Sequence, residues 1–483
     1  MRLTAAGERA LAELRAGPVQ SAAAAVLARR LTDAGMAHPV PVHPVPVHPV
    51  PVHPVSAADR EPGCDEPGRP GPLAVTLIIP ARDRADMLDR CLSAAGADFR
   101  VVVVDDGSAD AKSVAAVAAR HGAALYRHDR SAGPGAARNT GLADVNTELV
   151  AFLDSDCVPP SGWIATLAAQ LADPLVGAVA PRIVAHIPAA GSAAAVRYAA
   201  ACGSLDLGPR PARVAPGSRV SYVPTAALLV RRSALESIAG PGGAVFDSAL
   251  RFGEDVDLVW RLHRAGWRVR YDPSVEVGHE VPRDWASLLA KRFSYGTAAA
   301  PLARRHPANM PPLVLQPWPA TAAAALVARK PLVALVAAAG GWLDMTARVR
   351  KAGIPADGTP AATATAISQT WLGIGRYATQ FAAPLLAAVL VAPGGRTRAR
   401  RWGRRAAAAS LLLGPAVRSY RQHQPELMPV PFMLAHIADD ACYGAGVWTG
   451  CVRERTILPV RPVLSWRPLR MADSAIEEVK PDG

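Results

Sequence analysis

The chain has 483 residues and a formal net charge of +13, and only 5% of its residues are aromatic. This length accommodates two or three domains with a large buried core. Six scattered cysteines without a Cys-x-x-Cys pair exclude a short disulfide scaffold and favour a reducing compartment. Few aromatic residues lie between the basic ones, so we expect no nucleic-acid partner.

The first two regions of the chain carry no catalytic constellation. Residues 1–37 have apolar residues at helical spacing around Gly17-Pro18, which predicts a small helical module. Residues 38–72 begin with an HPVPV repeat, whose alternating prolines predict an extended linker. The histidines of the repeat are spread along this extended chain, which does not favour a metal site. The N-terminus has no basic-then-apolar signal sequence, so we expect a protein that is not secreted.

Residues 73–300 are predicted to form an α/β domain. Apolar runs at residues 73–80, 100–104, 123–126 and 150–153 predict strands, and helical patterns lie between them. Continuous apolar runs separated by helices are typical of a parallel sheet with both faces covered. We therefore predict a mostly parallel twisted sheet flanked by helices.

The stretch VAFLDSDCVPP ends a predicted buried strand with two carboxylates, Asp154 and Asp156. The carboxyl edge of a parallel sheet is where α/β folds bind ligands. Mg²⁺ is usually held by one or two carboxylates together with substrate phosphates. The pair therefore predicts a metal that grips a diphosphate, and the ordinary alternative is a strand-to-turn junction with solvated acids.

Polar residues also follow a second predicted strand and lie at the start of a predicted helix. Asp105 and Asp106 follow four valines, where a carboxylate can accept a hydrogen bond from a ribose hydroxyl or a base N–H. The alternative there is a plain turn that Ser108 caps. Arg138 follows Gly133-Pro134-Gly135 at a predicted helix start, and it can pair with a phosphate or brace the sheet.

Glu254 and Asp255 begin a predicted helix, with apolar residues behind them. This pair can be a general base and its neighbour, or it can be ordinary acidic residues at a helix N-terminus. His279 follows the next predicted strand. It is a candidate metal ligand only if the fold returns it to the acidic strand end.

Six segments in this order resemble the inverting family 2 glycosyltransferases of the GT-A fold. These segments are IIPARD, VVVVDDGSAD, GPGAARNTGL, VAFLDSDCVPPSGW, YVPTAALLVRRSAL and FDSALRFGEDVDLVWRLHRAGWRVRYDP with the GH that follows. The resemblance implies that Pro80, Arg82 and Asp83 border the nucleotide. It also implies that Asp105 or Asp106 contacts the uridine.

The same resemblance assigns the chemistry. Asp154 and Asp156 would form a DxD motif that binds Mg²⁺ or Mn²⁺ and the sugar diphosphate of a UDP-sugar donor. Asp255, next to Glu254, would be the general base on the acceptor hydroxyl, and His279 would be a further metal ligand.

A longer resemblance, to the glycosyltransferases of the mycofactocin system, covers most of the chain. It includes KRFSYGTAAAPLARRHP and HQPELMPVPFMLAHIADDACYGAGVWTGC. It implies β-1,4 transfer of glucose from UDP-glucose to a premycofactocin, a peptide-derived redox cofactor. The N-terminal module is shorter than is usual in this family, and the HPVPV repeat is peculiar to this chain. The alternative acceptor is a cell-envelope polysaccharide or a lipid-linked sugar.

Residues 301–483 are predicted to be helical, with apolar stretches at 313–343 and 371–395. Spanning helices, interfacial helices and soluble helices all remain open. The basic run from Arg396 to Arg405 fits a cytoplasmic flank, so we expect the cytoplasm or the cytoplasmic face of the membrane. We expect three polar residues of this region to face water: His436, Asp439 and Asp440.

Competing classes fit less well. Sugar nucleotidyltransferases open with a glycine-rich loop after the first strand, and Pro80-Ala81-Arg82-Asp83-Arg84 has no glycine. Processive membrane synthases carry a Gln-x-x-Arg-Trp signature that is not found here. A binding or scaffold protein would not require Asp154, Asp156 and Asp255 together.

Overall fold

The computed structural model describes residues 4–40, 74–96, 99–187, 193–310, 312–353, 355–393 and 397–465. The predicted linker therefore lies almost entirely outside the described residues, and so does Arg396. The chain divides into two compact units. The first contains the chain up to His186 together with Gly203–Glu280, and the second contains Ile187–Cys202 together with the chain from Val281 to Asp473.

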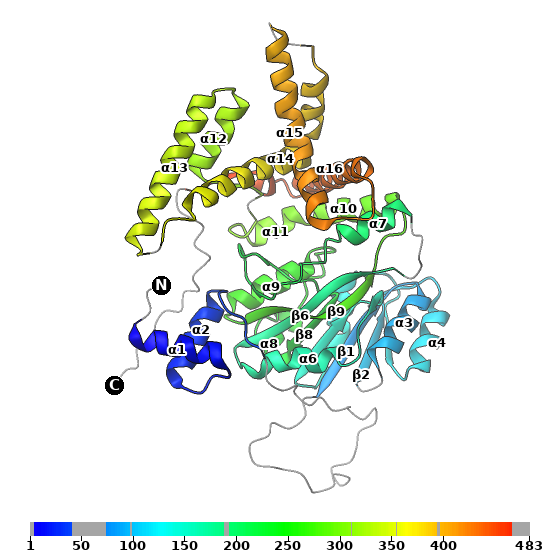
Figure 1. The fold of residues 1–483 in the computed structure, drawn as a ribbon. Coiled ribbons are helices and arrows are strands. Elements are labelled where there is room, and N and C mark those ends of the chain that lie inside the picture. The colour runs from blue at the N-terminus through cyan, green and yellow to red at the C-terminus, as the bar shows by residue number, and fades with distance from the viewer. Residues whose placement is uncertain are drawn as a thin grey trace. The chain divides into compact units, whose positions relative to one another are not determined.

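A nine-stranded sheet forms the centre of the first unit (Figure 1). In chain order its strands are β1 (Val75–Ala81), β2 (Arg100–Asp105), β3 (Ala124–Arg127), β4 (Leu149–Leu153), β5 (Cys157–Val158), β6 (Val176–His186), β7 (Ala212–Val214), β8 (Ala227–Arg231) and β9 (Arg268–Glu280). Their spatial order is β3-β2-β1-β4-β8-β6-β9-β5, with β7 also paired to β9. The apolar runs predicted to be strands thus lie next to one another in β1 to β4.

The sheet is parallel over its first half and mixed over its second. β1 pairs in parallel with β2 and β4, and β2 pairs in parallel with β3. β8 then runs antiparallel to both β4 and β6. The α/β class is confirmed, whereas β6 was not predicted.

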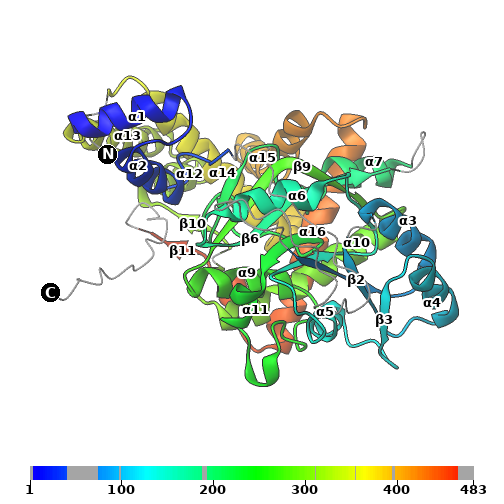
Figure 2. The ribbon, with the colours of Figure 1, turned by 90° about the horizontal axis from the view of Figure 1, so that it is seen from below.

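Helices cover both faces of this sheet. They are α3 (Ala85–Ala95), α4 (Ala111–Arg120), α5 (Pro134–Leu142), α6 (Trp163–Ala168), α8 (Arg232–Glu236) and α9 (Glu254–Arg264). Alternate β1 residues such as Leu77 and Ile79 share one buried core with α3, α4 and α6. On the opposite face a Cβ at Gly141 of α5 would lie 2.6 Å from Ile78 Cγ2, so glycine allows α5 to pack closely. Figure 2 shows α5 and α9 on one side of the sheet and α3 and α6 on the other.

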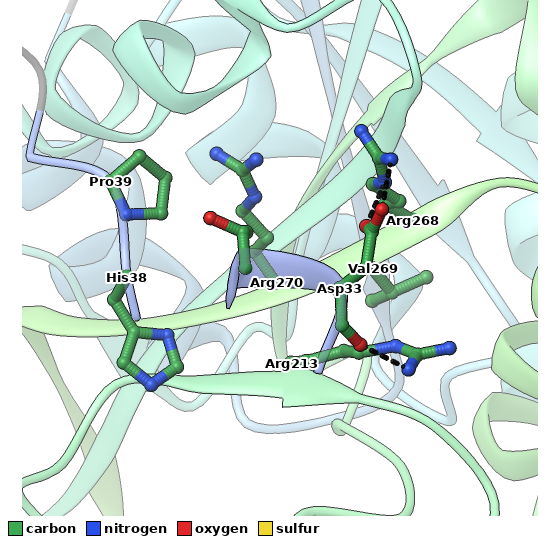
Figure 3. Close-up of a pocket in the computed structure, with 8 residues that line it drawn as sticks. Asp33, His38, Pro39, Arg213, Arg268, Val269 and Arg270 are labelled. Atoms are coloured by element: carbon green, nitrogen blue, oxygen red, sulfur yellow. Dashed lines mark hydrogen bonds and ion pairs between the residues drawn. The ribbon is translucent and has the colours of Figure 1, made fainter. Parts of the chain in front are cut away.

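The N-terminal module belongs to the first unit. Its helices α1 (Ala5–Ala16) and α2 (Ala22–Asp33) are capped by Thr4 and Ser21. The Asp33 carboxylate receives two hydrogen bonds of 2.8 Å from Arg268 of β9, and its carbonyl oxygen receives one of 2.6 Å from Arg213 of β7. A small basic pocket remains beside this junction, lined by Thr32, Asp33, His38, Pro39, Arg213, Arg268, Val269 and Arg270 (Figure 3).

The second unit is mainly helical. Its helices are α7 (Ala194–Ala201), α10 (Trp285–Thr297), α11 (Ala299–Arg305), α12 (Pro317–Val327), α13 (Pro331–Lys351), α14 (Thr359–Val391), α15 (Arg398–His423) and α16 (Pro429–Arg453), and the strands β10 (Val314–Leu315) and β11 (Val463–Leu464) pair with each other. Glycines bring α16 into backbone contact with two neighbours. A Cβ at Gly446 would lie 2.0 Å from Phe293 O of α10, and one at Gly444 would lie 1.6 Å from Gln380 O of α14.

Two carboxylates of α16 are buried, which makes the expectation that they face water wrong. Asp439 is 6% exposed and Asp440 is 2% exposed. Asp439 pairs with Arg292 of α10, and Asp440 accepts a hydrogen bond of 2.9 Å from Gln380 of α14. Because α16 packs against both helices, its acidic residues meet their donors inside the unit.

Two of the described helices, α13 and α14, are long and apolar enough to cross a membrane by length and composition. Within the most apolar window of each, only 11% of the residues are buried.

Candidate functional site

The sheet topology brings the predicted nucleotide-binding residues to one edge. β1 and β2 are parallel neighbours, and Ala81 pairs with Asp105 at their carboxyl ends. The loops that follow these strands are tied together: Ser108 Oγ accepts a hydrogen bond of 2.7 Å from the Asp83 N–H, and Asp83 Oδ1 accepts one of 2.8 Å from the Ala109 N–H. Pro80, Arg82 and Asp83 therefore lie on the same edge as Asp105 and Asp106.

Asp106 holds the third loop of this edge in place. Its carboxylate accepts hydrogen bonds from the N–H groups of Ala132 (2.8 Å) and Gly133 (2.9 Å), from Ser131 Oγ (2.7 Å) and from His128 Nδ1 (2.8 Å). Burial by itself would raise the pKa of Asp106, but these hydrogen bonds outweigh it and hold the pKa below its ordinary value. Sequence reasoning missed His128 and Ser131, although they lie just before the glycine-rich turn that it singled out.

The carboxylate of Asp105 also pairs with donors of the protein itself. Its side chain is 1% exposed, pairs with Arg127 and accepts a hydrogen bond of 2.9 Å from the Ser108 N–H. Arg82, by contrast, reaches Ser131 Oγ (3.1 Å) with a side chain that is half exposed. In this structure Asp105 and Asp106 thus shape the loops, and Arg82 is the more accessible group.

Asp154 and Asp156 follow β4, as predicted, and His279 lies beside them. β5 and β9 are antiparallel, and Cys157 pairs with His279. This pairing places His279 Nε2 3.5 Å from Asp156 Oδ1. The fold therefore meets the condition under which His279 was a candidate ligand.

Asp154, Asp156 and His279 offer oxygen and nitrogen donors to a divalent cation. Among the described residues, no three His, Cys, Asp or Glu side chains are already gathered closely enough to hold a metal. Two partly exposed carboxylates and an imidazole nevertheless make a suitable donor set for Mg²⁺ or Mn²⁺ when substrate phosphates and water complete the coordination. The donor set fits a metal that arrives with the nucleotide.

Arg138 joins the acidic strand end to the acidic helix start. Its Nη2 donates to Asp154 Oδ1 (2.6 Å), and its Nη1 donates to Glu254 Oε1 (2.8 Å). The guanidinium is 2% exposed and lies over the Phe246 ring, 5.6 Å from its centroid. Three residues that the sequence singled out separately, in α5, after β4 and in α9, thus form one chain of ion pairs around a buried guanidinium.

Asp255 is the neighbour of this chain. Burial, followed by the negative charge of Glu254, raises the pKa of Asp255 to about 7. Its Oδ1 accepts a hydrogen bond of 2.8 Å from the Val256 N–H. The next acid, Asp257, is instead buried and paired with Arg261 (2.8 Å), so it has a structural role.

The cysteine next to the acidic pair is not a nucleophile. Cys157 is fully buried, and burial followed by the charge of Asp156 raises the pKa of its thiol well above the ordinary value.

The basic pocket of Figure 3 is lined by none of the residues predicted for the site. The acidic edge of the sheet is therefore where the predicted residues gather.

Comparison with known proteins defines the class. Residues 76–238 match the model of glycosyl transferase family 2, and this segment contains β2 to β8 and all but the first residue of β1, together with Asp154 and Asp156. A solved structure with a similar arrangement is the mannosyltransferase PcManGT from Pyrobaculum calidifontis in complex with GDP-Man and Mn²⁺. It is 20% identical, with a TM-score of 0.43, over 78% of this chain and 87% of that one. The matched segment is therefore that of a family 2 glycosyltransferase.

The comparison with curated relatives extends beyond that segment. The pre-mycofactocin glycosyltransferase of Mycobacterium tuberculosis is 36% identical over 467 residues, which cover 92% of this chain and 88% of that protein. Glycosyltransferase AglE of Haloferax volcanii is 29% identical over 231 residues, covering 46% of this chain and 71% of AglE. The chain belongs to the family of the pre-mycofactocin glycosyltransferases. The resemblance found in the sequence is confirmed at this level.

Proposed function

We propose that the protein transfers glucose from UDP-glucose, in β-1,4 linkage, to a premycofactocin-type acceptor. Family membership supports glycosyl transfer, and the name of the similar Mycobacterium tuberculosis protein supports the acceptor. The observation that carries the proposed mechanism is the chain of ion pairs Glu254–Arg138–Asp154, with Asp255 next to Glu254. It links a candidate base to a candidate donor site.

Asp255 acts as the general base in this proposal. A pKa near 7 suits a base that must be ionised at neutral pH and still accept a proton. The carboxylate takes the proton of the acceptor hydroxyl as its oxygen bonds to C1 of glucose. The bond from C1 to the diphosphate oxygen breaks on the opposite side, and UDP leaves with the electron pair. An α-linked donor thereby gives a β-linked product.

Asp154, Asp156 and His279 are the proposed ligands of Mg²⁺ or Mn²⁺. A cation held there would neutralise the negative charge that develops on the leaving diphosphate. Glu254 positions Arg138, and Arg138 orients Asp154 through its hydrogen bond of 2.6 Å. Pro80, Arg82, Asp83 and one of Asp105 and Asp106 are proposed to border the uridine.

The test is UDP release with Mn²⁺ and a premycofactocin-type acceptor, across UDP-glucose, UDP-galactose, UDP-GlcNAc and GDP-mannose. We expect acceptor-dependent release from UDP-glucose and a hexose added to the acceptor by mass. Asp255→Asn should reduce the rate of release by about two to four orders of magnitude and retain UDP binding. Glu236→Gln, which removes an exposed carboxylate, is the matched control and should leave both unchanged.

Turnover with a different donor would overturn UDP-glucose and leave the mechanism standing. Turnover with a lipid-linked sugar, and none with the premycofactocin-type acceptor, would favour the alternative acceptor. The exposed apolar helices α13 and α14 are the observation that supports this alternative acceptor.

The same helices support a proposed location at the cytoplasmic face of a membrane. We also propose that residues 73–300 form the transferase domain and that residues 301–483 form its helical, membrane-associated region. Residues 1–37 and 38–72 remain the proposed N-terminal module and linker.

A further inference from the structure

The tip formed by the end of α14 and the start of α15 combines exposed apolar and basic side chains. Leu385 and Val391 of α14 are 68% and 76% exposed, and Trp402 of α15 is 62% exposed. Arg398, Arg400 and Arg401 are exposed beside them. Exposed leucine, valine and tryptophan beside arginines are typical of a surface that contacts a lipid headgroup layer.

The charge of this region has one sign only. Between Asp357 and Glu426 the sequence contains nine arginines and no lysine, aspartate or glutamate. Two of these arginines stabilise the tip itself, since Arg404 donates to Ala392 O (2.6 Å) and Arg405 to Val391 O (3.5 Å). The three exposed arginines therefore face solvent without an acid nearby in sequence, and their complement is an anionic surface.

The geometry favours one leaflet over a complete crossing. α14 and α15 pack side by side, and a Cβ at Gly375 of α14 would lie 2.4 Å from Leu411 O of α15. The apolar part of α15 between Arg405 and Arg418 has 12 residues, which span about 18 Å. A bilayer core is about 30 Å thick. The apolar part of α15 is therefore too short to cross, and a kink at Ala382 interrupts the apolar end of α14.

We propose that this tip, defined as Leu385, Val391, Trp402 and the arginines 398, 400 and 401, binds the surface of an anionic membrane. The arginines contact the headgroups, and the three apolar side chains enter one leaflet. This proposal rests on the membrane location proposed above and names the surface and the class of lipid. It does not depend on the donor or the acceptor.

The test is flotation of the full chain with phosphatidylcholine vesicles that either contain or lack phosphatidylglycerol. We expect binding to the anionic vesicles that weakens as salt is added, because exposed charges are screened. The triple variant Arg398→Gln, Arg400→Gln, Arg401→Gln should lose on the order of 100-fold in partitioning, about fivefold for each arginine. Leu385→Ser with Val391→Ser should remove the binding that persists at high salt.

The matched control is the triple variant Arg9→Gln, Arg29→Gln, Arg30→Gln, which removes the same charge from exposed positions of α1 and α2. It should bind like wild type, and all variants should keep UDP release with a soluble acceptor. Equal losses in the two triple variants would overturn the proposal, because the attraction would then be general. Equal binding to both vesicle types, no vesicle binding, or preference for RNA or an acidic protein would also overturn it. None of these outcomes bears on glycosyl transfer, which the activity assay tests separately.

Discussion

The guanidinium of Arg138 lies 2.6 Å from the carboxylate of Asp154, although one side chain comes from α5 and the other follows β4. The second terminal nitrogen holds Glu254, which is 7% exposed. Two of the three charges, on Arg138 and Glu254, are thus buried, and Asp154 is partly exposed. Removing the central cation leaves two like charges facing each other in that site.

We therefore expect Arg138→Met to lower the free energy of unfolding by about 3–5 kcal/mol, since breaking a buried pair strands its partners. Chemical denaturation measures this loss. Arg120→Met is the matched control, because Arg120 forms an exposed pair with Asp89 that should be worth at most about 1 kcal/mol. Similar losses in the two variants would contradict a special role for Arg138.

The pH dependence of transfer should report Asp255. Its carboxylate must be ionised to accept a proton, so kcat/KM should fall about tenfold per pH unit below the pKa of about 7. Asp255→Asn should reduce kcat by about two to four orders of magnitude and remove this limb. A limb that persists in the variant would assign the titration to another group.

Ionisation of Asp255 should lower the stability of the folded protein, whereas it raises kcat/KM. The pKa of Asp255 is raised in the folded state, so stability falls as the pH rises from the ordinary pKa of the carboxyl, 3.8, to about 7, and the full cost is present above that pH. Asp255→Asn should therefore be more stable than wild type above that pH and similar to it in acid. Thermal unfolding across pH measures the difference, and a less stable variant at high pH would refute it.

The hydrogen bonds of Asp106 should stabilise the loop at residues 128–133, which lies at the proposed nucleotide-binding edge of the sheet. Asp106→Asn replaces one acceptor oxygen with a donor and leaves N–H groups such as that of Gly133 without a partner. We expect a loss of about 1–3 kcal/mol in stability and weaker UDP binding. Asp129→Asn, in the same loop but exposed, should change neither by more than a few tenths of a kcal/mol. Equal effects of the two changes would rule out the proposed support of the loop.

The metal proposal predicts how UDP binding responds to a chelator. Removal of the divalent cation should weaken binding of UDP and leave binding of uridine, which has no phosphates, unchanged. Asp156→Ala and His279→Ala should each reduce the contribution of Mn²⁺ to UDP affinity by about tenfold or more. Calorimetric titration with and without Mn²⁺ measures it. Full retention of that contribution in both variants would remove these two residues from the ligand set.

The sequence predicted the parallel half of the sheet because β1, β2 and β4 are continuous apolar runs. It did not predict β6, whose eleven residues include Gly177 and Pro181, which usually interrupt strands. The position of His279 beside Asp156 depends on antiparallel pairing of β5 and β9, more than a hundred residues apart in the chain. No local pattern encodes that contact.

The burial of the acidic residues of α16 also could not be predicted from the sequence. A helical pattern of two adjacent acids does not reveal whether neighbouring helices bring donors to them. Arg292 and Gln380 do so for Asp439 and Asp440, and burial follows from that tertiary pairing. Likewise, the sequence suggested that Arg138 pairs with a phosphate or braces the sheet, but only the fold joined it to Glu254.

The hydrogen bonds around Asp106 also bear on how quickly a donor can bind. Four protein donors fix residues 128–133 against the end of β2 when no nucleotide is present. The conformational entropy of that loop is lost when the chain folds and not when the nucleotide arrives. The edge proposed to bind the uridine is therefore rigid before the donor arrives, and donor binding need not wait for this loop to close.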